Sequence, residues 1–144
     1  MILLPIKRNI WDVLAVCDNK GNCELLDFFN DLDSNYNSSM EKLMAIISQI
    51  SDDNFGPRLL PDDVSHYVHK EEKIFEFIAG DLRLLWFYSA SIRKVIICSH
   101  CFVKDSKRTP PLQIKKAIKA KKQYDTDVKS GAISVLDDDG GTDT

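Results

Sequence analysis

Basic residues gather in one stretch near the C-terminal end of the sequence. Eight Lys or Arg and one Asp lie between Lys104 and Lys122, a net charge of about +7. The whole chain carries −3, so the remaining residues sum to about −10. A strongly positive segment in an otherwise acidic protein is typical of a surface that binds a polyanion such as nucleic acid.

Arg83 is the second residue with a type and position suited to chemistry, because it lies within the apolar run Leu82–Tyr88. Strand alternation predicts that it shares a face with Leu85 and Phe87. A charge in such a run is costly unless it reaches solvent or an anion. The planar guanidinium can donate two parallel hydrogen bonds to a phosphate. Arg83 is therefore a candidate phosphate ligand, and pairing with a carboxylate such as Glu76, or a position at a sheet edge, is the alternative.

The cysteines and histidines offer a possible metal site, which we do not expect to form. The four cysteines are Cys17, Cys23, Cys98 and Cys101. Cys98 and Cys101 have a spacing typical of zinc or redox sites. They lie within a predicted strand, however, where positions three apart face opposite sides. His66 and His69 lie in a predicted loop and have no third ligand at a suitable spacing. We therefore expect reduced cysteines, no metal and no cofactor.

Sequence periodicity before and within this basic stretch predicts the elements that must position it. Alternation and helical periodicity predict strands at 11–17, 73–78, 82–88 and 94–103, and helices at 25–32, from Ser38 or Ser39 to about 50, and from 109–111 to 124. Residues 58–69 are predicted to be loop. The order is β-α-α-β-β-β-α, which predicts an α+β domain: two helices on one face of a small, mainly antiparallel sheet, followed by a basic C-terminal helix.

The length and composition predict a single domain. A chain of 144 residues has room for one core. We expect the folded domain to span residues 1–124, and residues 125–144 to form an acidic, flexible tail that could fold back over the basic helix. No apolar run approaches the roughly 20 residues that span a bilayer, and the start does not resemble a signal peptide. The sequence therefore predicts a cytoplasmic protein that does not contact the membrane.

Four segments, in order, resemble the phage-derived branch of the RelE/HigB family, whose members are the ribosome-dependent mRNA endonucleases of toxin–antitoxin pairs. Three are short: Leu25-Leu-Asp-Phe-Phe-Asn-Asp-Leu32, Phe75-Glu-Phe-Ile78 and Leu82-Arg-Leu-Leu-Trp-Phe-Tyr88. The fourth, His100-Cys-Phe-Val-Lys-Asp-Ser-Lys-Arg-Thr-Pro-Pro-Leu-Gln-Ile-Lys-Lys-Ala117, is similar to the family stretch His-Gly-Phe-x-Lys-Lys-Ser/Thr-x-Lys-Thr-Pro-x-x-Glu-Ile-x-x-Ala. The resemblance covers residues 11–124 and implies a RelE-like fold.

The resemblance also implies a set of site residues for RNA cleavage without a metal. This reaction needs an activated 2′-hydroxyl, cations that stabilise the charge on phosphorus, and a proton for the leaving oxygen. We predict that the catalytic residues are Arg83, Lys104, Lys107 and His100, and that the RNA-binding residues are Arg108, Lys115, Lys119, Lys122 and Tyr88. Solvated lysines, a packed His100 and a core position for Tyr88 are the alternatives.

The partners implied by the resemblance are the ribosome with its mRNA and a small antitoxin, commonly a helix-turn-helix protein. The antitoxin would cover a basic groove formed by the predicted site residues, or it would prevent access to the ribosome. Operator DNA would be bound only through the antitoxin, so that the complex represses its own operon.

The sequence departs from the family pattern at three positions, which leaves two other functions open. Asp105 replaces a lysine, Ile78 replaces the arginine of Glu-Leu-Arg, and Gln113 replaces the helix glutamate. Family members are also commonly basic overall, whereas this chain is acidic. One alternative is a ParE-like poison of DNA gyrase, for which Arg83 and Lys104 would be dispensable. The other is a non-catalytic phage-derived protein that binds nucleic acid or a host protein, which the lost basic groups favour.

Overall fold

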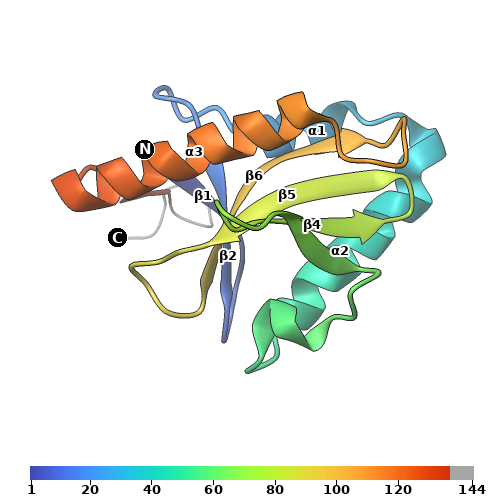
Figure 1. Cartoon of the computed structure of the whole chain (residues 1–144), viewed down its shortest axis with the longest axis horizontal. Helices are drawn as coiled ribbons and strands as arrows, with labels where there is room; N and C mark the ends of the chain where they lie inside the picture. The colour runs from blue at the N-terminus through green and yellow to red at the C-terminus, as the bar shows by residue number, and fades with distance from the viewer. Residues whose placement is uncertain (137–144) are drawn as a thin grey trace.

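A computed structural model describes residues 1–136 as a seven-stranded sheet with three α-helices (Figure 1). The strands are β1 (Ile2–Arg8), β2 (Asp12–Cys17), β3 (Ser65–His69), β4 (Ile74–Ala79), β5 (Leu82–Tyr88), β6 (Val95–Val103) and β7 (Ser134–Val135). The helices are α1 (Glu24–Asp31), α2 (Asn37–Ser51) and α3 (Pro111–Ser130), with short 3₁₀ turns η1 (Ser34–Tyr36) and η2 (Gly56–Leu59). The class is α+β, as the sequence predicted. No helix in this part of the chain is long and apolar enough to cross a membrane.

The strands lie in the order β3-β4-β5-β6-β2-β1-β7. The pairs β2–β6 and β1–β7 are parallel and the other neighbours are antiparallel. The predicted meander of three strands is therefore present as β4-β5-β6. A tight turn joins β4 to β5, and Gly80 adopts φ 57° there. A side chain at Gly80 would clash, because an added Cβ would lie 2.2 Å from Ser39 Oγ.

Each face of the sheet packs against its own helices. Leu25 of α1 and Leu43 of α2 join the core that contains Trp86 of β5, whereas Tyr124 of α3 packs on the opposite face against Phe87. Figure 1 shows α3 crossing one side of the sheet, with α2 on the other side. The predicted alternation along β5 is confirmed, since Arg83 lies on the strand face that packs against α3.

A β-bulge in β6 changes which way its cysteines face. Trp86 of β5 pairs with Cys98, but Leu85 pairs with His100, so Ser99 is an extra residue in β6. The expectation that Cys98 and Cys101 face opposite sides is therefore wrong, and both lie in the core beneath α1 and α2. Burial raises the pKa of both thiols, to about 12 for Cys101. The described residues contain no group of three His, Cys, Asp or Glu that could hold a metal ion.

Three strands and part of a helix lie outside the predicted elements. β1 was not predicted, and β3 lies in residues 58–69, which were predicted to be loop. β3 is a half-exposed edge strand with the polar sequence Ser-His-Tyr-Val-His, so it lacks an apolar alternation. α3 continues six residues beyond Tyr124, and β7 follows it and pairs with β1. The ordered fold therefore extends past the predicted boundary at residue 124. The last part of the predicted acidic tail, residues 137–144, lies outside the described residues.

Candidate functional site

The loop between β6 and α3 brings its cations next to Arg83. Arg83 pairs directly with Phe102 of β6, and the backbone N–H of Lys104 donates to Asp81 O at 2.7 Å. The start of the loop is thereby tied to the β4–β5 turn beside Arg83. A narrow crevice results, lined by Arg83, Phe102, Lys104, Asp105, Ser106, Lys107, Arg108, Thr109 and Pro110. Cationic side chains from β5 and from the loop after β6 therefore line one depression.

A larger groove of about 380 Å³ adjoins this crevice and shares four of its residues. It is lined by His66, Val68, Glu76, Ile78, Arg83, Lys107, Arg108, Thr109 and Ile114. We refer to the crevice and this groove together as the basic groove. Ile78 lies where the family resemblance places an arginine, and it contributes an apolar wall instead.

Arg83 is held in place by its own hairpin, and the Nη2 atom of its guanidinium remains available to a ligand. Its Nη1 donates to Gly80 O at 2.7 Å and to Leu82 O at 2.9 Å, and its Nε lies 4.0 Å from a carboxylate oxygen of Glu76. The side chain is 13% exposed. Within residues 1–136 no hydrogen bond is formed by Nη2. Because Nη2 carries two N–H donors, it can bind an anionic oxygen in the groove.

Glu76 lies at the floor of the groove and connects three separate elements. It is 3% exposed and accepts hydrogen bonds from Thr109 Oγ1, at 2.5 Å, and His66 Nε2, at 3.2 Å, in addition to its contact with Arg83. His66 Nδ1 lies 2.9 Å from Asp62 O. Both ring nitrogens thus face acceptors, so both contacts are hydrogen bonds only when the ring carries two protons.

Sequence reasoning missed the roles of His66 and Thr109. His66 and Glu76 are direct partners in the β3–β4 register. This register could have indicated the contact, but only if Ser65–His69 had been recognised as a strand. Glu76 itself had been considered as a partner of Arg83, and the structure brings the two together.

His100 lies outside the basic groove, contrary to the prediction that it acts beside Arg83. It is 2% exposed, and its ring contacts Ser99 Oγ through Nδ1 at 2.8 Å and Gln113 Oε1 through Nε2 at 2.7 Å. Burial beneath α3 lowers the pKa of the imidazole, against the opposing effect of the Gln113 contact. The arrangement indicates a neutral histidine that helps to dock α3 on β6.

Tyr88 also lies away from the groove. It is at the far end of β5 on the opposite face from Arg83, and its ring packs edge-on against Trp11, Phe75 and Trp86. Burial raises the pKa of its hydroxyl. The predicted contact of Tyr88 with RNA is therefore not supported by its position, and the residue belongs to the core.

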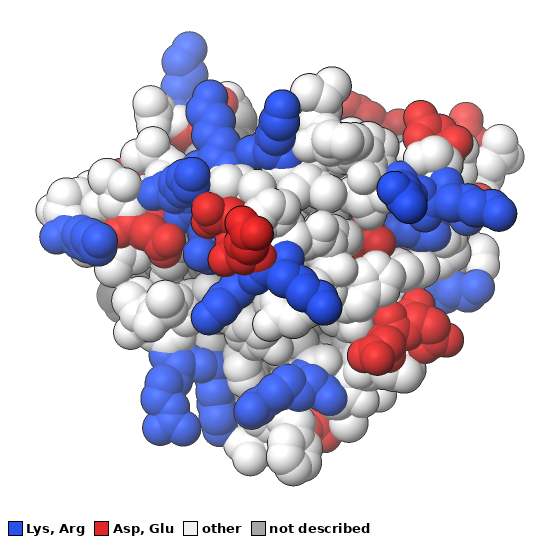
Figure 2. All heavy atoms as spheres, viewed as in Figure 1, with Lys and Arg blue, Asp and Glu red and all other residues white. Residues whose placement is uncertain are grey.

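The three predicted RNA-binding lysines of α3 share one depression of about 350 Å³. Its lining consists of Lys115, Ile118, Lys119, Lys122, Gln123 and Thr126. Lys122 lies 3.9 Å from a carboxylate oxygen of Glu72, which partly offsets its charge. Figure 2 shows Lys and Arg gathered over α3 and over the loop that precedes it, with acidic side chains interspersed. The lysines therefore form a second cationic surface on α3, the helix that also contributes Ile114 to the basic groove.

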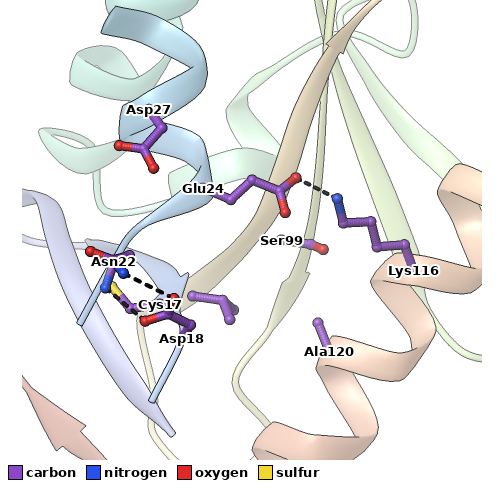
Figure 3. A pocket seen from close by; sticks show the side chains of 9 residues that line it. Cys17, Asp18, Asn22, Glu24, Asp27, Ser99, Lys116 and Ala120 are labelled. Atoms are coloured by element: carbon purple, nitrogen blue, oxygen red, sulfur yellow. Dashed lines mark hydrogen bonds and ion pairs between the residues drawn. The ribbon is translucent and has the colours of Figure 1, made fainter. Parts of the chain in front are cut away.

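A further pocket, of about 330 Å³, is acidic, in contrast to the cationic groove and α3 (Figure 3). Asp18, Glu24 and Asp27 contribute carboxylates to it, and Lys116 of α3 pairs with Glu24 of α1 at its edge. Backbone N–H groups of Asn22 and Lys20 donate to Asp18 and lower the pKa of its carboxyl. Its carboxylates make this acidic pocket unsuited to binding a phosphate group.

Comparison with known protein families gives a match over the part of the chain that builds this site. Residues 27–122, two thirds of the sequence, match the family described as "Phage derived protein Gp49-like (DUF891)". The matched range contains Glu76, Arg83 and the whole basic loop. No curated protein shows a significant match. The chain belongs to the Gp49-like family of phage-derived proteins, a toxin-like family related to the RelE/HigB toxins.

Proposed function

We propose that this protein is a toxin of the RelE/HigB type that cleaves mRNA in the decoding site of the ribosome without a metal ion. The observation that carries the proposal is the basic groove, where Arg83 and the loop cations Lys104, Lys107 and Arg108 line one depression. A cluster of this kind suits a group with two or more anionic oxygens, such as a backbone phosphodiester.

RNA cleavage has three requirements, and the groove directly provides cations that can stabilise the negative charge on phosphorus. When the 2′-hydroxyl attacks the adjacent phosphate, negative charge builds up on the non-bridging oxygens. Fixed donors aimed at that charge are usually the largest single contribution to catalysis, at about 10²–10³-fold for one donor. Arg83 is such a fixed donor, because two backbone carbonyls and Glu76 hold its side chain. The lysines of the loop add a less directional positive field.

The cationic face of α3 fits contact with ribosomal RNA. Lys115, Lys119 and Lys122 lie on one side of the helix and line a shared depression. Lysine contacts with phosphates release counterions and depend strongly on salt, and they carry no sequence information. In this proposal α3 holds the protein on the ribosome, while the basic groove acts on the mRNA.

A partner protein is part of the proposal. A toxin that cleaves mRNA must be restrained in its own host, and an antitoxin that covers the basic groove would neutralise it. A helix-turn-helix antitoxin would also bring the complex to operator DNA. The site of action is the cytoplasm, where translation takes place.

Controlled expression in bacteria tests the proposal. Wild-type protein is expected to arrest growth and to produce mRNA ends at fixed positions within codons. The Arg83→Ala variant is expected to permit growth and to lack these cuts. Arg93→Ala is the matched control, because Arg93 is an exposed arginine in the turn before β6 and does not line the groove.

A non-catalytic role is the second candidate, and it is favoured by Ile78 and Asp105 in the lining of the groove. It predicts no growth arrest by the wild-type protein. Growth arrest that is accompanied by DNA damage, and that persists in Arg83→Ala, would instead indicate a ParE-like action on gyrase.

A further inference from the structure

We propose that Glu76 is a positioning residue, whose hydrogen bond with Thr109 fixes the cationic loop against the floor of the basic groove. The loop consists of residues 104–110. The effect of this bond on RNA rests on the proposed function, whereas its effect on the loop does not.

The first support is the burial of Glu76 and the origin of its partners. A carboxylate that is 3% exposed needs hydrogen bonds or opposite charges, because burying an isolated charge is very costly. Glu76 meets this need with groups from three different places: His66 of β3, Arg83 of β5 and Thr109 of the loop. The same carboxylate therefore sets the relative positions of the sheet, the arginine and the loop.

The second support is the small number of other attachments of the loop. Its first residue, Lys104, donates its backbone N–H to Asp81 O, and within the loop Ser106 Oγ donates to Arg108 O. Pro110 and Pro111 have no N–H to donate. Among the described residues, no backbone hydrogen bond joins residues 105–110 to the sheet. The hydroxyl of Thr109 is thus the anchor at the far end of the loop.

The third support is electrostatic. Lys104, Lys107 and Arg108 line the same crevice as Arg83, and like charges around one crevice repel one another. These loop cations are exposed, so this repulsion favours positions of the loop that lie farther from Arg83. The Thr109 hydrogen bond opposes this movement, and the carboxylate that accepts it also offsets the charge of Arg83. A ligand phosphate then meets cations that are already in place.

Limited digestion of the full chain by trypsin tests directly whether the hydrogen bond from Thr109 to Glu76 holds the loop. Trypsin cleaves after Lys and Arg, so Lys104, Lys107 and Arg108 provide cleavage sites within the loop. Thr109→Val keeps the shape of the side chain but removes the donor. Since a hydrogen bond to a charged group shifts an opening equilibrium by roughly ten- to a hundredfold, loop cleavage should accelerate by at least about tenfold. Thr109→Ser, which keeps a hydroxyl, should restore the wild-type rate.

Cleavage after Lys20, in the exposed turn before α1, provides the internal control. The proposal predicts that this rate is the same in Thr109→Val and wild type. Loop cleavage at the wild-type rate in Thr109→Val would overturn the proposal. Equal acceleration at Lys20 and in the loop would also overturn it, because it would show that Thr109 supports the whole fold and not the position of the loop.

Binding of a 2′-O-methyl RNA oligonucleotide, which cannot be cleaved by its own 2′-hydroxyl, separates this proposal from the proposed function. If both are correct, Thr109→Val binds this RNA about tenfold more weakly than wild type or Thr109→Ser. If wild type does not bind the RNA but the loop of Thr109→Val is still digested faster, the Thr109 hydrogen bond does hold the loop. The proposed function on RNA is then contradicted. If wild type binds RNA and Thr109→Val binds equally well, the positioning role of Glu76 fails.

Discussion

Arg83 has a rigid setting that an ordinary surface arginine lacks. Its Nη1 is held by two carbonyl oxygens of its own hairpin, and its Nε faces a buried carboxylate. Such a side chain loses little conformational freedom when it binds a ligand, and its free donors have a fixed direction. The shape of the guanidinium, as well as its charge, should therefore matter.

The Arg83→Lys variant tests this requirement. Lysine keeps the positive charge, but it cannot donate to both carbonyl oxygens and to a phosphate in the planar arrangement of a guanidinium. We expect mRNA cleavage on ribosomes to fall by about 10²–10³-fold, with little change in the melting temperature. Cleavage rates and thermal unfolding of the two proteins provide the check. Activity within a factor of about two of wild type would show that charge alone suffices.

His100 illustrates how burial can change the role of a residue. The imidazole lies beneath α3, and desolvation lowers its pKa from the ordinary value of 6.5. Gln113 and Glu24 oppose this shift, and Lys116 reinforces it. In the unfolded chain the histidine takes up a proton near pH 6.5, while the folded protein still resists protonation.

The stability of the protein should therefore depend on pH in a defined direction. Between the lowered pKa of folded His100 and about 6.5, the unfolded state binds more protons, so the free energy of unfolding falls as the pH falls. The contribution of His100 to the free energy of unfolding is complete above pH 6.5. It is lost as the pH drops through the pKa of His100 in the folded protein. Denaturant unfolding on both sides of pH 6.5 measures it. His100→Asn should flatten this dependence, and an unchanged slope would assign it to other groups.

At the scale of elements, the β5–β6 hairpin and α3 contribute different parts of the cationic surface. The hairpin places Arg83 and the start of the loop side by side, and α3 carries the lysines that extend the positive surface. Because the α3 lysines contact phosphates only through charge in the proposed function, their effect should appear as a dependence on salt.

A triple variant, Lys115→Ala, Lys119→Ala and Lys122→Ala, tests the role of α3. If each lysine neutralises one phosphate of single-stranded RNA, the slope of log affinity against log salt should decrease by roughly 2. Binding to a single-stranded RNA oligonucleotide at several salt concentrations measures the slope. The matched control replaces Lys20, Lys42 and Lys70, which are exposed lysines outside the groove and α3. Equal slopes for the two triple variants would remove α3 from the interface.

Some elements of the fold could be predicted from the sequence, and others could not. Alternation along Leu82–Tyr88 was enough to place Arg83 on one face, because β5 is central and strongly apolar. β3 could not be predicted in this way, since its polar residues pair at a half-exposed edge. The contact of His66 with Glu76 depends on that pairing and was missed with it. The bulge at Ser99 leaves no local pattern, so the facing of the cysteines could not be foreseen.

The end of α3 was missed for a related reason. The acidic residues that follow Tyr124 suggested a tail, yet they are compatible with a helix. The helix in fact ends at Gly131, which adopts φ 71° in a left-handed cap. The burial of His100 could not be foreseen either, because only the packing of α3 over β6 determines it.

At the scale of the whole molecule, charge is partly separated between surfaces, with some acidic side chains interspersed among the cations (Figure 2). The loop and α3 carry about +7 between residues 104 and 122, whereas the pocket between α1 and α3 is lined by carboxylates. In the proposed function, an RNA ligand would be attracted to the first surface and repelled from the second, so the net charge of −3 would not prevent binding at one face. The separation also fits neutralisation by a partner that presents acidic groups to the basic groove.

Cleavage of a defined mRNA on programmed bacterial ribosomes by the purified protein, mapped by primer extension, tests the central claim most directly. We expect a cut within the codon in the decoding site, loss of the cut in Arg83→Ala, and protection of the mRNA by a 2′-O-methyl group on the nucleotide before the cut. Equal cutting by Arg83→Ala, or cutting of the protected mRNA, would contradict the proposed mechanism.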